Sequence, residues 1–347
     1  MTTVQMFWHG KPLSPYELLC LQSFVDLGHT VHVYTYENQK IPPQFEVYDA
    51  AEIISFASYF DYTSTGGRKT ASAFSNLFRY RLLYERGGWW VDTDVICLTR
   101  KIPNYDLFFA WEVSPKIIGS AVLFAPAGHP LMAACADAAI ELIAETGAEF
   151  PWGTIGPRLL TSKIAAMGYT DDAYPSSVCY PLHHSEALSF LSPSAAESIS
   201  GRTRDSVFVH LWNEVLMDEN IDKTQRPAAG SFLGAVADRH SVAGWKSALS
   251  ETFIEALVER NELRAETNKL RVLKEKTHRL RLDLKEKDDQ LRDTSARLRQ
   301  ARLKCTNALA ALKAIKSSRS WRITKPLRMV SNALFTAKRR RRGSAKV

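Results

Sequence analysis

Apolar and polar residues follow one another in the first part of the chain with the two periods that strands and helices require. The segments VQMFW, at residues 4 to 8, and HTVHVYTY, at residues 29 to 36, have the pattern of strands. Between them, PLSPYELLCLQSFVDLG predicts a helix that ends at Gly28. Strand, helix and strand in so short a stretch predict a crossover unit, and therefore an α/β fold with parallel strands and flanking helices.

A second helix and strand lead into two acidic residues. The segment ASAFSNLFRYRLLYER has apolar residues near helical spacing, and Gly87 and Gly88 predict the end of that helix. WWVDTDV then predicts a strand that runs into Asp92 and Asp94. The α/β alternation continues to about residue 215 through DLFFAWE, SAVLFAP, helices near 129 to 146 and 156 to 167, and SVFVHLW.

The composition of the chain changes after Trp245, and a long charged helix without proline is expected over residues 250 to 316. Leucine recurs there every seventh residue, at Leu263, Leu270, Leu284, Leu291, Leu298 and Leu312, with Thr277 and Cys305 in the two missing places. The positions four residues after each are mostly polar: Thr267, Lys274, Arg281, Asp288, Ser295 and Arg302. A weak or heteromeric coiled coil, coiled-coil self-association and a single solvated helix therefore all stay open.

Charge divides the chain in the same place. Residues 251 to 347 carry 27 Lys and Arg against 11 Asp and Glu, whereas the preceding residues carry 18 against 26. We therefore expect three parts: an α/β domain over residues 1–245, the long helix over 250–316, and a basic amphipathic tail over 317–347. In the tail, apolar residues lie among the cations, which suits an anionic membrane surface. No recognition fold for nucleic acid accompanies these cations, so no nucleic-acid partner is expected.

The remaining composition bears on location. The five cysteines are scattered and form no C-x-x-C pair, which favours a reducing compartment. The N-terminus has no basic and apolar leader, and no apolar run is long enough to span a membrane. We expect a cytoplasmic protein that associates peripherally with the inner (plasma) membrane through its tail.

Asp92 and Asp94 form a D-x-D triplet, which alone is weak evidence and can be a polar turn. Its place is more informative, because carboxylates at the C-terminal end of a strand lie where α/β sheets bind ligands. Two carboxylates at this spacing can hold a hard divalent cation, with further oxygen ligands from a bound diphosphate.

The surrounding segment FSNLFRYRLLYERGGWWVDTDV resembles the core signature of glycosyltransferases with a sugar-binding DXD region, of the family 32 type, which are related to family 8 galactosyltransferases and the large glucosylating toxins. The positions that match are Ser75, Arg79, Tyr80, Gly87, Gly88, Trp90, Asp92 and Asp94. The resemblance implies a GT-A-like (Rossmann-like) mixed sheet, Mn²⁺ or Mg²⁺ held by the two aspartates, and a nucleotide-sugar donor, with a UDP-sugar favoured and a GDP-sugar also open. It also implies retention of the α configuration.

The same resemblance nominates further site residues. VFVHLWNE is similar to a His-x-Trp region of these enzymes, which implies His210 as a third metal ligand and Trp212 as a donor-binding residue. Arg79 and Trp90 would also bind the donor, as would Trp8 in the opening FWHG. PWGTIGPRLLT resembles a loop that shapes the acceptor side, which nominates Gly156 and Pro157.

One position departs from the family, since Asn76 stands where relatives commonly have an aspartate that touches the donor sugar. An amide can both accept and donate, so sugar binding is compatible with asparagine while the preferred hydroxyl pattern changes. The alternative interpretation is that Asn76 is simply an amide on the surface of a helix. No residue stands out as the catalytic base or nucleophile.

The tail segment SRSWRITKPLR resembles an element appended to many bacterial glycosyltransferases after a coiled coil. We therefore expect a metal-dependent glycosyltransferase that transfers a sugar to a saccharide or lipid-linked acceptor in surface polysaccharide or glycolipid assembly. The alternatives are a transferase-like scaffold that recruits partners to the membrane through the long helix and tail, and a nucleic-acid-binding protein that uses the tail.

Overall fold

The computed structural model describes residues 1–37, 41–63, 69–147, 149–151 and 153–331, and every structural statement below refers to these residues. Two compact units are present, Met1–Ala265 and Glu266–Val347, and each is described by itself. The expected boundaries at 245, 250 and 317 stay predictions. The expected tail is described only as far as residue 331.

The predicted helices and strands occur in the predicted order, with two differences: of the strand predicted over DLFFAWE only Trp111 and Glu112 lie in a regular strand, and the strand predicted over WWVDTDV is interrupted. The strands are β1 (Thr3–Phe7), β2 (Thr30–Thr35), β3 (Glu46–Asp49), β4 (Tyr62–Thr63), β5 (Lys69–Thr70), β6 (Gly88–Val91), β7 (Val95–Cys97), β8 (Trp111–Val113), β9 (Ile117–Ile118), β10 (Val122–Ala125), β11 (Phe208–His210), β12 (Gln225–Arg226) and β13 (Ser247–Ala248). The α-helices are α1 (Pro15–Asp26), α2 (Ser72–Glu85), α3 (Pro130–Thr146), α4 (Leu159–Ala166), α5 (Ala196–Arg202), α6 (Asn213–Asp218), α7 (Phe232–Arg239), α8 (Glu251–Ser317) and α9 (Arg319–Ile323). Short helical turns of other types are η1 (Ala50–Glu52), η2 (Phe56–Ser58), η3 (Thr154–Arg158), η4 (Thr170–Asp172), η5 (Ser176–Val178) and η6 (His184–Leu191).

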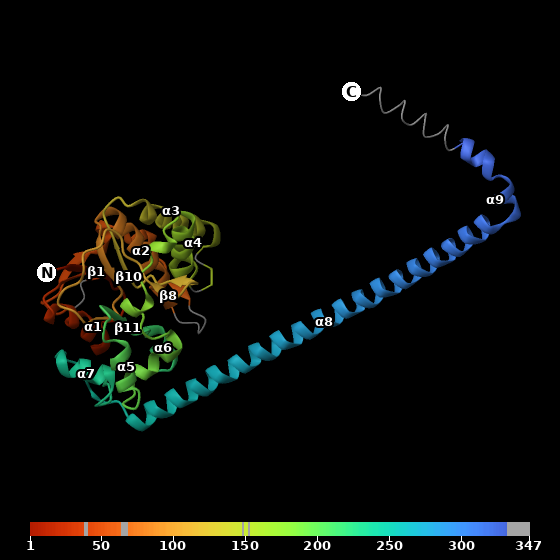
Figure 1. Cartoon of the computed structure of the whole chain (residues 1–347). Helices are drawn as coiled ribbons and strands as arrows, with labels where there is room; N and C mark the ends of the chain where they lie inside the picture. The colour runs from red at the N-terminus through yellow and green to blue at the C-terminus, as the bar shows by residue number, and fades with distance from the viewer. Residues whose placement is uncertain (38–40, 64–68, 148, 152, 332–347) are drawn as a thin grey trace. The chain divides into compact units, whose positions relative to one another are not determined.

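A five-stranded sheet with the order β10-β6-β1-β2-β3 forms the centre of the first unit. The pairs β1–β2, β2–β3 and β1–β6 are parallel, and only the edge pair β10–β6 is antiparallel. The expected crossover from β1 through α1 to β2 is therefore confirmed. Helices α2, α3 and α4 lie together on one side of this sheet and α1 lies on the other (Figure 1). The prediction of a mixed α/β sheet with flanking helices, followed by a long charged helix, is confirmed.

Side chains alternate between two cores, one on each face of the sheet. In β6, Trp89 and Val91 belong to the core on the α1 side, whereas Trp90 belongs to the core on the α2 side. This is the two-residue period of a strand, and it explains why two adjacent tryptophans can both be buried. The apolar run therefore supplies both faces of the sheet at once.

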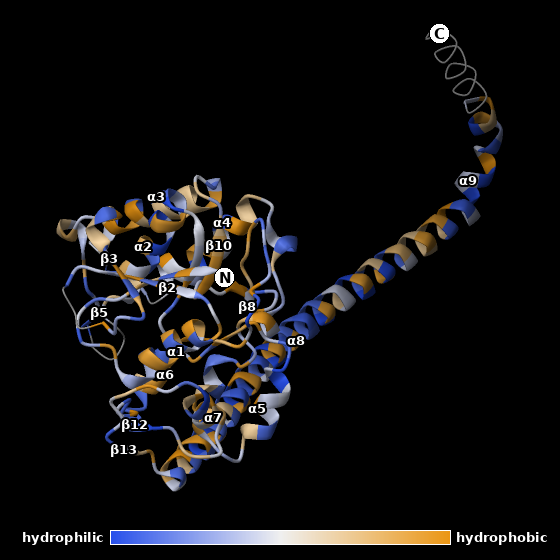
Figure 2. Cartoon of the chain, turned by 90° about the vertical axis from the view of Figure 1, so that its left-hand side faces the viewer, coloured by the Kyte–Doolittle hydropathy of each residue, from blue (hydrophilic) through white to orange (hydrophobic). Residues whose placement is uncertain are grey.

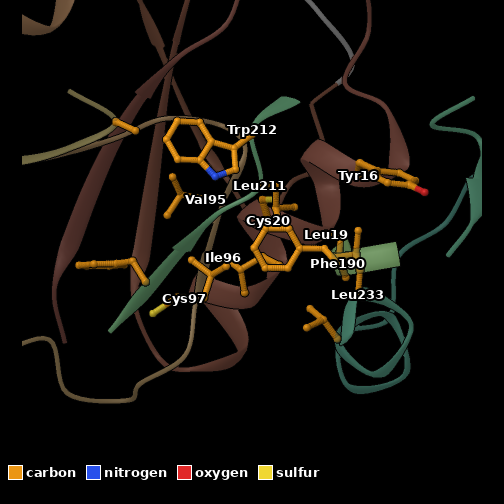
Figure 3. Close-up of a cluster of buried hydrophobic side chains, with 14 of the residues drawn as sticks. Tyr16, Leu19, Cys20, Val95, Ile96, Cys97, Phe190, Leu211, Trp212 and Leu233 are labelled. Carbon is orange, nitrogen blue, oxygen red and sulfur yellow. The ribbon is translucent and has the colours of Figure 1, made fainter. Parts of the chain in front are cut away.

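The strand predicted over WWVDTDV is divided in two. β6 ends at Val91, and β7 begins at Val95 and pairs antiparallel with β11 in a separate two-stranded sheet. The core around β7 and β11 includes Leu19 and Cys20 of α1 and Phe190 of η6 (Figure 3). Asp92 and Asp94 thus lie where the chain leaves one sheet for another, and the expectation that they follow the end of a strand is confirmed.

The second unit contains most of α8, whose side chains are exposed from residue 261 onwards apart from a few of intermediate exposure. Apolar and polar residues are interspersed along this helix (Figure 2). None of the helices in the described ranges combines the length and the apolar character needed to cross a lipid bilayer.

The turn between α2 and β6 depends on glycine. Gly87 has a φ of +67° and Gly88 a φ of +92°, a region that side chains with a Cβ rarely adopt. A Cβ on Gly87 would also lie 2.5 Å from the backbone nitrogen of Ala127, so the chain would have to shift. By contrast, Gly28 has a φ of +87° with nothing within 4 Å of its Cβ position.

We predict that Gly87→Ala destabilises the protein more than Gly28→Ala. The left-handed backbone alone costs roughly 1–2 kcal/mol in both variants, and the collision with Ala127 adds about 1–3 kcal/mol only at Gly87. Chemical denaturation of both variants measures the difference. Equal losses of unfolding free energy would show that close packing of this turn does not constrain the strand before Asp92.

Candidate metal and sugar-nucleotide site

The loop from Asp92 to Asp94 is fixed by backbone hydrogen bonds at both ends. The Asp92 N–H donates to the carbonyl of Ala121 at 2.8 Å, which continues the β6–β10 pairing by one residue. On the other side, the N–H of Leu211 donates to the carbonyl of Asp94 at 2.9 Å. The two aspartates are thus held between β10 and the end of β11.

The register of β7 with β11 brings a third side chain to this loop. His210 pairs with Val95, the first residue after Asp94. Its Nε2 lies 3.2 Å from Oδ2 of Asp94, and one ligand atom each from Asp92, Asp94 and His210 lie within 4.8 Å of one another. The structure therefore brings together the three residues that the sequence nominated as metal ligands.

Two buried side chains, Arg79 and Trp90, hold the carboxylate of Asp92. Its Oδ1 accepts hydrogen bonds from Arg79 Nη2 at 2.9 Å and from Trp90 Nε1 at 2.7 Å. Arg79 also donates to the carbonyl of Ser120 at 2.7 Å, and its guanidinium carbon lies 5.0 Å from the centre of the Trp90 ring. Only 3% of Arg79 and 1% of Trp90 is exposed, so in this structure both contact Asp92 and present almost no surface to a ligand. Their direct contact with a donor stays a prediction.

Asp94 is held by the chain that follows β11. The N–H of Asn213, at the start of α6, donates to Oδ2 of Asp94 at 2.8 Å. Between His210 and Asn213, Trp212 has a φ of +58°, an unusual conformation for a bulky residue. Its ring lies 4.3 Å from that of His210, and its Nε1 donates to the carbonyl of Leu182. The strained turn thus packs Trp212 against the histidine.

Burial and the charges of neighbouring groups shift the pKa values of the three candidate ligands in different directions. Burial and the nearby Asp94 charge raise the pKa of Asp92, although Arg79 opposes this. For Asp94, burial raises the pKa, but the positive charge and hydrogen bond of His210 outweigh it and lower the pKa to about 2. Burial lowers the pKa of His210, but Asp94 outweighs it and the net shift is upward. Without a cation, the site therefore favours a charged Asp94–His210 pair.

The residues fit a divalent cation on two observations. Carboxylate oxygens with one imidazole nitrogen are a donor set used for divalent metals, and a cation would replace the histidine proton as the positive partner of the carboxylates. In addition, Nδ1 of His210 is buried without a hydrogen-bond partner among the described residues.

The remaining nominated residues occupy two places. Asn76, on α2, donates to the carbonyl of Ser72 at 3.0 Å and accepts from Ser120 Oγ at 3.3 Å. A Cβ on Gly156 would lie 2.8 Å from Oδ1 of Asn76, so the nominated acceptor loop, with Pro157 in η3, packs directly on the nominated sugar contact. A small pocket beside Asn76 is lined by Tyr62, Ser72, Ala73, Phe150, Gly153, Thr154 and Ile155.

Trp8 lies elsewhere, just after the end of β1, where its Nε1 donates to the carbonyl of Lys11 at 2.6 Å. It is partly exposed, and its contact with a nucleotide base stays a prediction.

Glu112 is a residue that sequence reasoning missed. It lies in β8, partly buried, and burial raises its pKa while the positive charge of His210 opposes the shift. Its negative charge also helps to raise the pKa of the buried Tyr180, whose ring lies 5.7 Å from that of His210. The sequence offered only an acidic residue at the end of DLFFAWE, because nothing local indicated which strand would approach His210.

We predict a pH dependence of stability from the Asp94–His210 pair in metal-free protein. The lowered pKa of Asp94 stabilises the fold above its ordinary pKa of 3.8, and this contribution of about 2 kcal/mol is lost as the pH falls through the folded-state value. The raised pKa of His210 stabilises the fold below the ordinary 6.5 and is lost as the pH rises through the folded-state value. The difference in unfolding free energy between the unchanged protein and Asp94→Asn, measured in EDTA, should therefore be largest between pH 3.8 and pH 6.5.

The exposed Asp171→Asn serves as the matched control, with a difference that stays near zero across the same range. A difference between Asp94→Asn and the unchanged protein that grows from neutral to alkaline pH contradicts the assigned pair.

Comparison with known proteins finds a match over the part of the chain that contains Asp92 and Asp94. Residues 20–109 match a family model described as glycosyltransferase sugar-binding region containing DXD motif. No curated protein matches the chain significantly. Among solved structures, the chain is similar to "PaToxG Glycosyltransferase" at 12% identity and a TM-score of 0.37, over 48% of this chain and 69% of that one.

The chain is also similar to the glycosyltransferase GlyE of Streptococcus pneumoniae TIGR4. Its apo-form shows 12% identity and a second structure 11%, each with a TM-score of 0.35 over 70% of this chain. In both cases the match spans 61% of the GlyE chain, which is less than two thirds of its length. Residues 20–109 thus match a glycosyltransferase region that contains a DXD motif, and Asp92 and Asp94 within this match form a candidate metal site with His210, which lies outside it.

Proposed function

We propose that this protein is a metal-dependent, retaining glycosyltransferase with a GT-A-like domain, which transfers a hexose from a nucleotide sugar to a saccharide or lipid-linked acceptor. The observation that carries the proposal is the convergence of Asp92, Asp94 and His210 within 4.8 Å. The two aspartates lie inside the family match and follow the end of β6 in the central mixed sheet, and His210 joins them from outside the match. A UDP-sugar is the favoured donor, and a GDP-sugar is the second choice. Retention of configuration comes from the resemblance to the family.

Each residue of the site has a defined task in this proposal. Mn²⁺ or Mg²⁺ held by the three ligands would offset the negative charge that builds on the leaving diphosphate. Arg79 and Trp90 orient Asp92 through its Oδ1, and the N–H of Asn213 orients Asp94 through its Oδ2. Because buried side chains and backbone groups hold both carboxylates, little reorganisation is needed when the donor binds.

The acceptor and sugar side lies toward Asn76 and Gly156. The amide of Asn76 is already paired with Ser72 and Ser120, so its carbonyl oxygen points toward the same group of residues as the nominated acceptor loop. An aspartate there would place a carboxylate against the Ser72 carbonyl, so asparagine suits this site, and we expect the preferred hydroxyl pattern of the donor to change accordingly. Glu112 supplies a further carboxyl group, whose negative charge helps to raise the pKa of His210, and the catalytic base stays unassigned.

We predict that metal-dependent hydrolysis of a nucleotide sugar is lost in the double variant Asp92→Asn/Asp94→Asn. Purified protein is tested with UDP- and GDP-sugars in the presence of Mn²⁺, Mg²⁺ or EDTA. Removing both charged ligands should lower turnover by at least about 100-fold, since the charge of the leaving diphosphate is then left unbalanced. The donor that is turned over fastest identifies the sugar and the base.

The matched control is Asp171→Asn/Asp172→Asn, which removes two exposed acidic residues and should leave turnover unchanged. Because Asp92→Asn also leaves Arg79 buried beside an uncharged partner, the melting temperature of each variant is measured and the assay is run well below it. If no donor binds or reacts in a metal-dependent way, the alternative of a transferase-like scaffold is favoured.

We also propose that the tail places the enzyme at an anionic membrane surface. In the described part of the tail, Ile323, Leu327 and Met329 are 77%, 73% and 66% exposed. The cations Arg319, Arg322, Lys325 and Arg328 lie among them, and Arg328 stacks on the exposed Trp321 at 3.6 Å. Exposed apolar residues among cations suit a lipid surface with anionic headgroups, where each cation adds on the order of 1 kcal/mol.

We predict that a chain ending at Lys316 no longer co-sediments with vesicles that contain anionic lipid, while its donor hydrolysis is retained. The variant Ile323→Ser/Leu327→Ser/Met329→Ser keeps every charge and should also bind more weakly, because it removes the side chains that enter the lipid interface. Unchanged sedimentation of the shortened chain is the result that excludes the tail as the anchor. The deletion includes residues 332–347, which lie outside the described residues.

A further inference from the structure

Helix α8 exposes a row of large apolar side chains that recur with a heptad period. The leucines at every seventh position include Leu270, Leu284 and Leu291, which are 60%, 69% and 64% exposed. These positions are named a, and the positions three residues later are named d. The d positions include Leu273, Leu280 and Ile315, with exposures of 58%, 58% and 55%. Together the a and d residues form what we call the heptad seam.

The second apolar row of the heptad seam lies three residues after each a position, not four. The positions four residues after each leucine are mostly polar, whereas the positions three residues after include Leu273, Leu280, Ala301, Ala308 and Ile315. Apolar residues separated alternately by three and four positions are typical of a helix face that packs against another helix. The second row is thus apolar at five of its eight positions, and Glu266, Lys287 and Thr294 occupy the other three.

A shallow depression lies on this face. It is lined by Leu270, Leu273, Lys274, Thr277, His278 and Arg281. Leu270 and Thr277 occupy successive a positions, Leu273 occupies the d position between them, and Lys274 is the residue after that d position. Such a set of four forms the hole that receives a side chain from the facing helix in a coiled coil. The shape of the surface thus agrees with the pattern of the sequence.

The residues that flank the heptad seam are mainly basic. The positions just before a and just after d are named g and e, and across residues 269–316 the charged ones are basic at Lys269, Lys274, Lys276, Arg281, Arg297, Arg302, Lys304 and Lys316, and acidic at Asp283 and Asp288. Charged residues at e and g decide which partner a coiled coil accepts, because they lie at the edge of the buried seam.

These flanks disfavour a second copy of the same helix. In a parallel pair, each g residue meets the e residue five positions later on the other chain, which sets Lys269 against Lys274, Lys276 against Arg281, Asp283 against Asp288, and Arg297 against Arg302. All four pairs have like charges. An antiparallel pair sets g against g and e against e, and each of these sets has four basic residues and a single acidic one. Self-association is thus opposed in both orientations.

We propose that the heptad seam of α8 binds an acidic helix of another protein, which carries apolar residues at its own a and d positions and Glu or Asp at its e and g positions. Such a partner buries the exposed leucines and pairs its carboxylates with the basic flanks. Lys287 occupies a d position within the seam, so an acidic residue opposite it would fix the register of the two helices. The scaffold alternative and the transferase proposal are both compatible with this interaction, which rests on α8 alone.

The test uses the full chain and a synthetic peptide as the probe. The peptide has the length of residues 270–316, with Leu at a and d and Glu at e and g. Its first control has the same composition in scrambled order, and its second has Lys in place of Glu. The acidic heptad peptide should bind the full chain at least about tenfold more tightly than either control, and more weakly as salt concentration rises. Equal binding of the scrambled peptide would show only a general attraction to the basic tail and would overturn the proposal.

Two matched variants locate the binding face. Leu284→Ala/Leu291→Ala removes two seam leucines and should weaken binding of the acidic peptide by at least about tenfold, since the buried apolar contact is lost. Val272→Ala/Leu282→Ala removes two side chains of similar exposure, 56% and 55%, that lie off the seam, and should leave binding unchanged. Alanine keeps the helix, which circular dichroism verifies. Equal effects of the two variants would contradict the assigned face.

Light scattering of the full chain alone completes the test. A monomer at low ionic strength is the expected result, because the flanks repel a second copy. A dimer that the off-seam variant retains and that Leu284→Ala/Leu291→Ala loses would replace the acidic partner by the chain itself and overturn the proposal.

Discussion

The candidate site depends on how a partly buried carboxylate, Asp92, is kept in place. A charged group removed from water is costly unless opposite charge and hydrogen bonds accompany it. Arg79 supplies the charge from α2, and Trp90 supplies a second donor from the same face of β6, two residues before Asp92. This pair ties the helix, the end of the strand and the Ser120 segment together, so the carboxylate of Asp92 has a single orientation. Its cost is that Arg79 and Trp90 are almost entirely withdrawn from solvent.

The same constraint explains why the chain changes sheets at this point. The glycine turn before β6 brings α2 close enough for Arg79 to reach Asp92, and the segment after Asp94 is then free to pair with β11 instead of extending the first sheet. That pairing delivers His210 to Asp94, and the strained turn at Trp212 directs the N–H of Asn213 onto the same carboxylate. Two sheets therefore contribute to one cluster of ligands, which neither could form alone.

Charge has a different role in the two units. In the first unit, charges close to the candidate site are buried or partly buried and form ion pairs, so they act on their immediate neighbours. In α8 and the described part of the tail, they are exposed, mainly basic, and adjacent to exposed apolar side chains. Exposed cations beside apolar surface select partners more than they stabilise a fold, because solvent screens them until a partner covers them. The acidic helix and the anionic surface that we propose both follow from this arrangement.

The sequence by itself determined the features that depend on local spacing. Period-two and helical patterns placed β1, α1, β2 and α2, the two glycines ended α2, and the strand before Asp92 was recognisable from its apolar run. Long-range contacts decided the rest. Nothing local showed that WWVDTDV divides between two sheets, that Arg79 is buried against Asp92, or that Glu112 approaches His210, because each depends on which distant strand becomes a neighbour. His210 was nominated only by resemblance, and tertiary structure alone, through the β7–β11 register, brings it to Asp94.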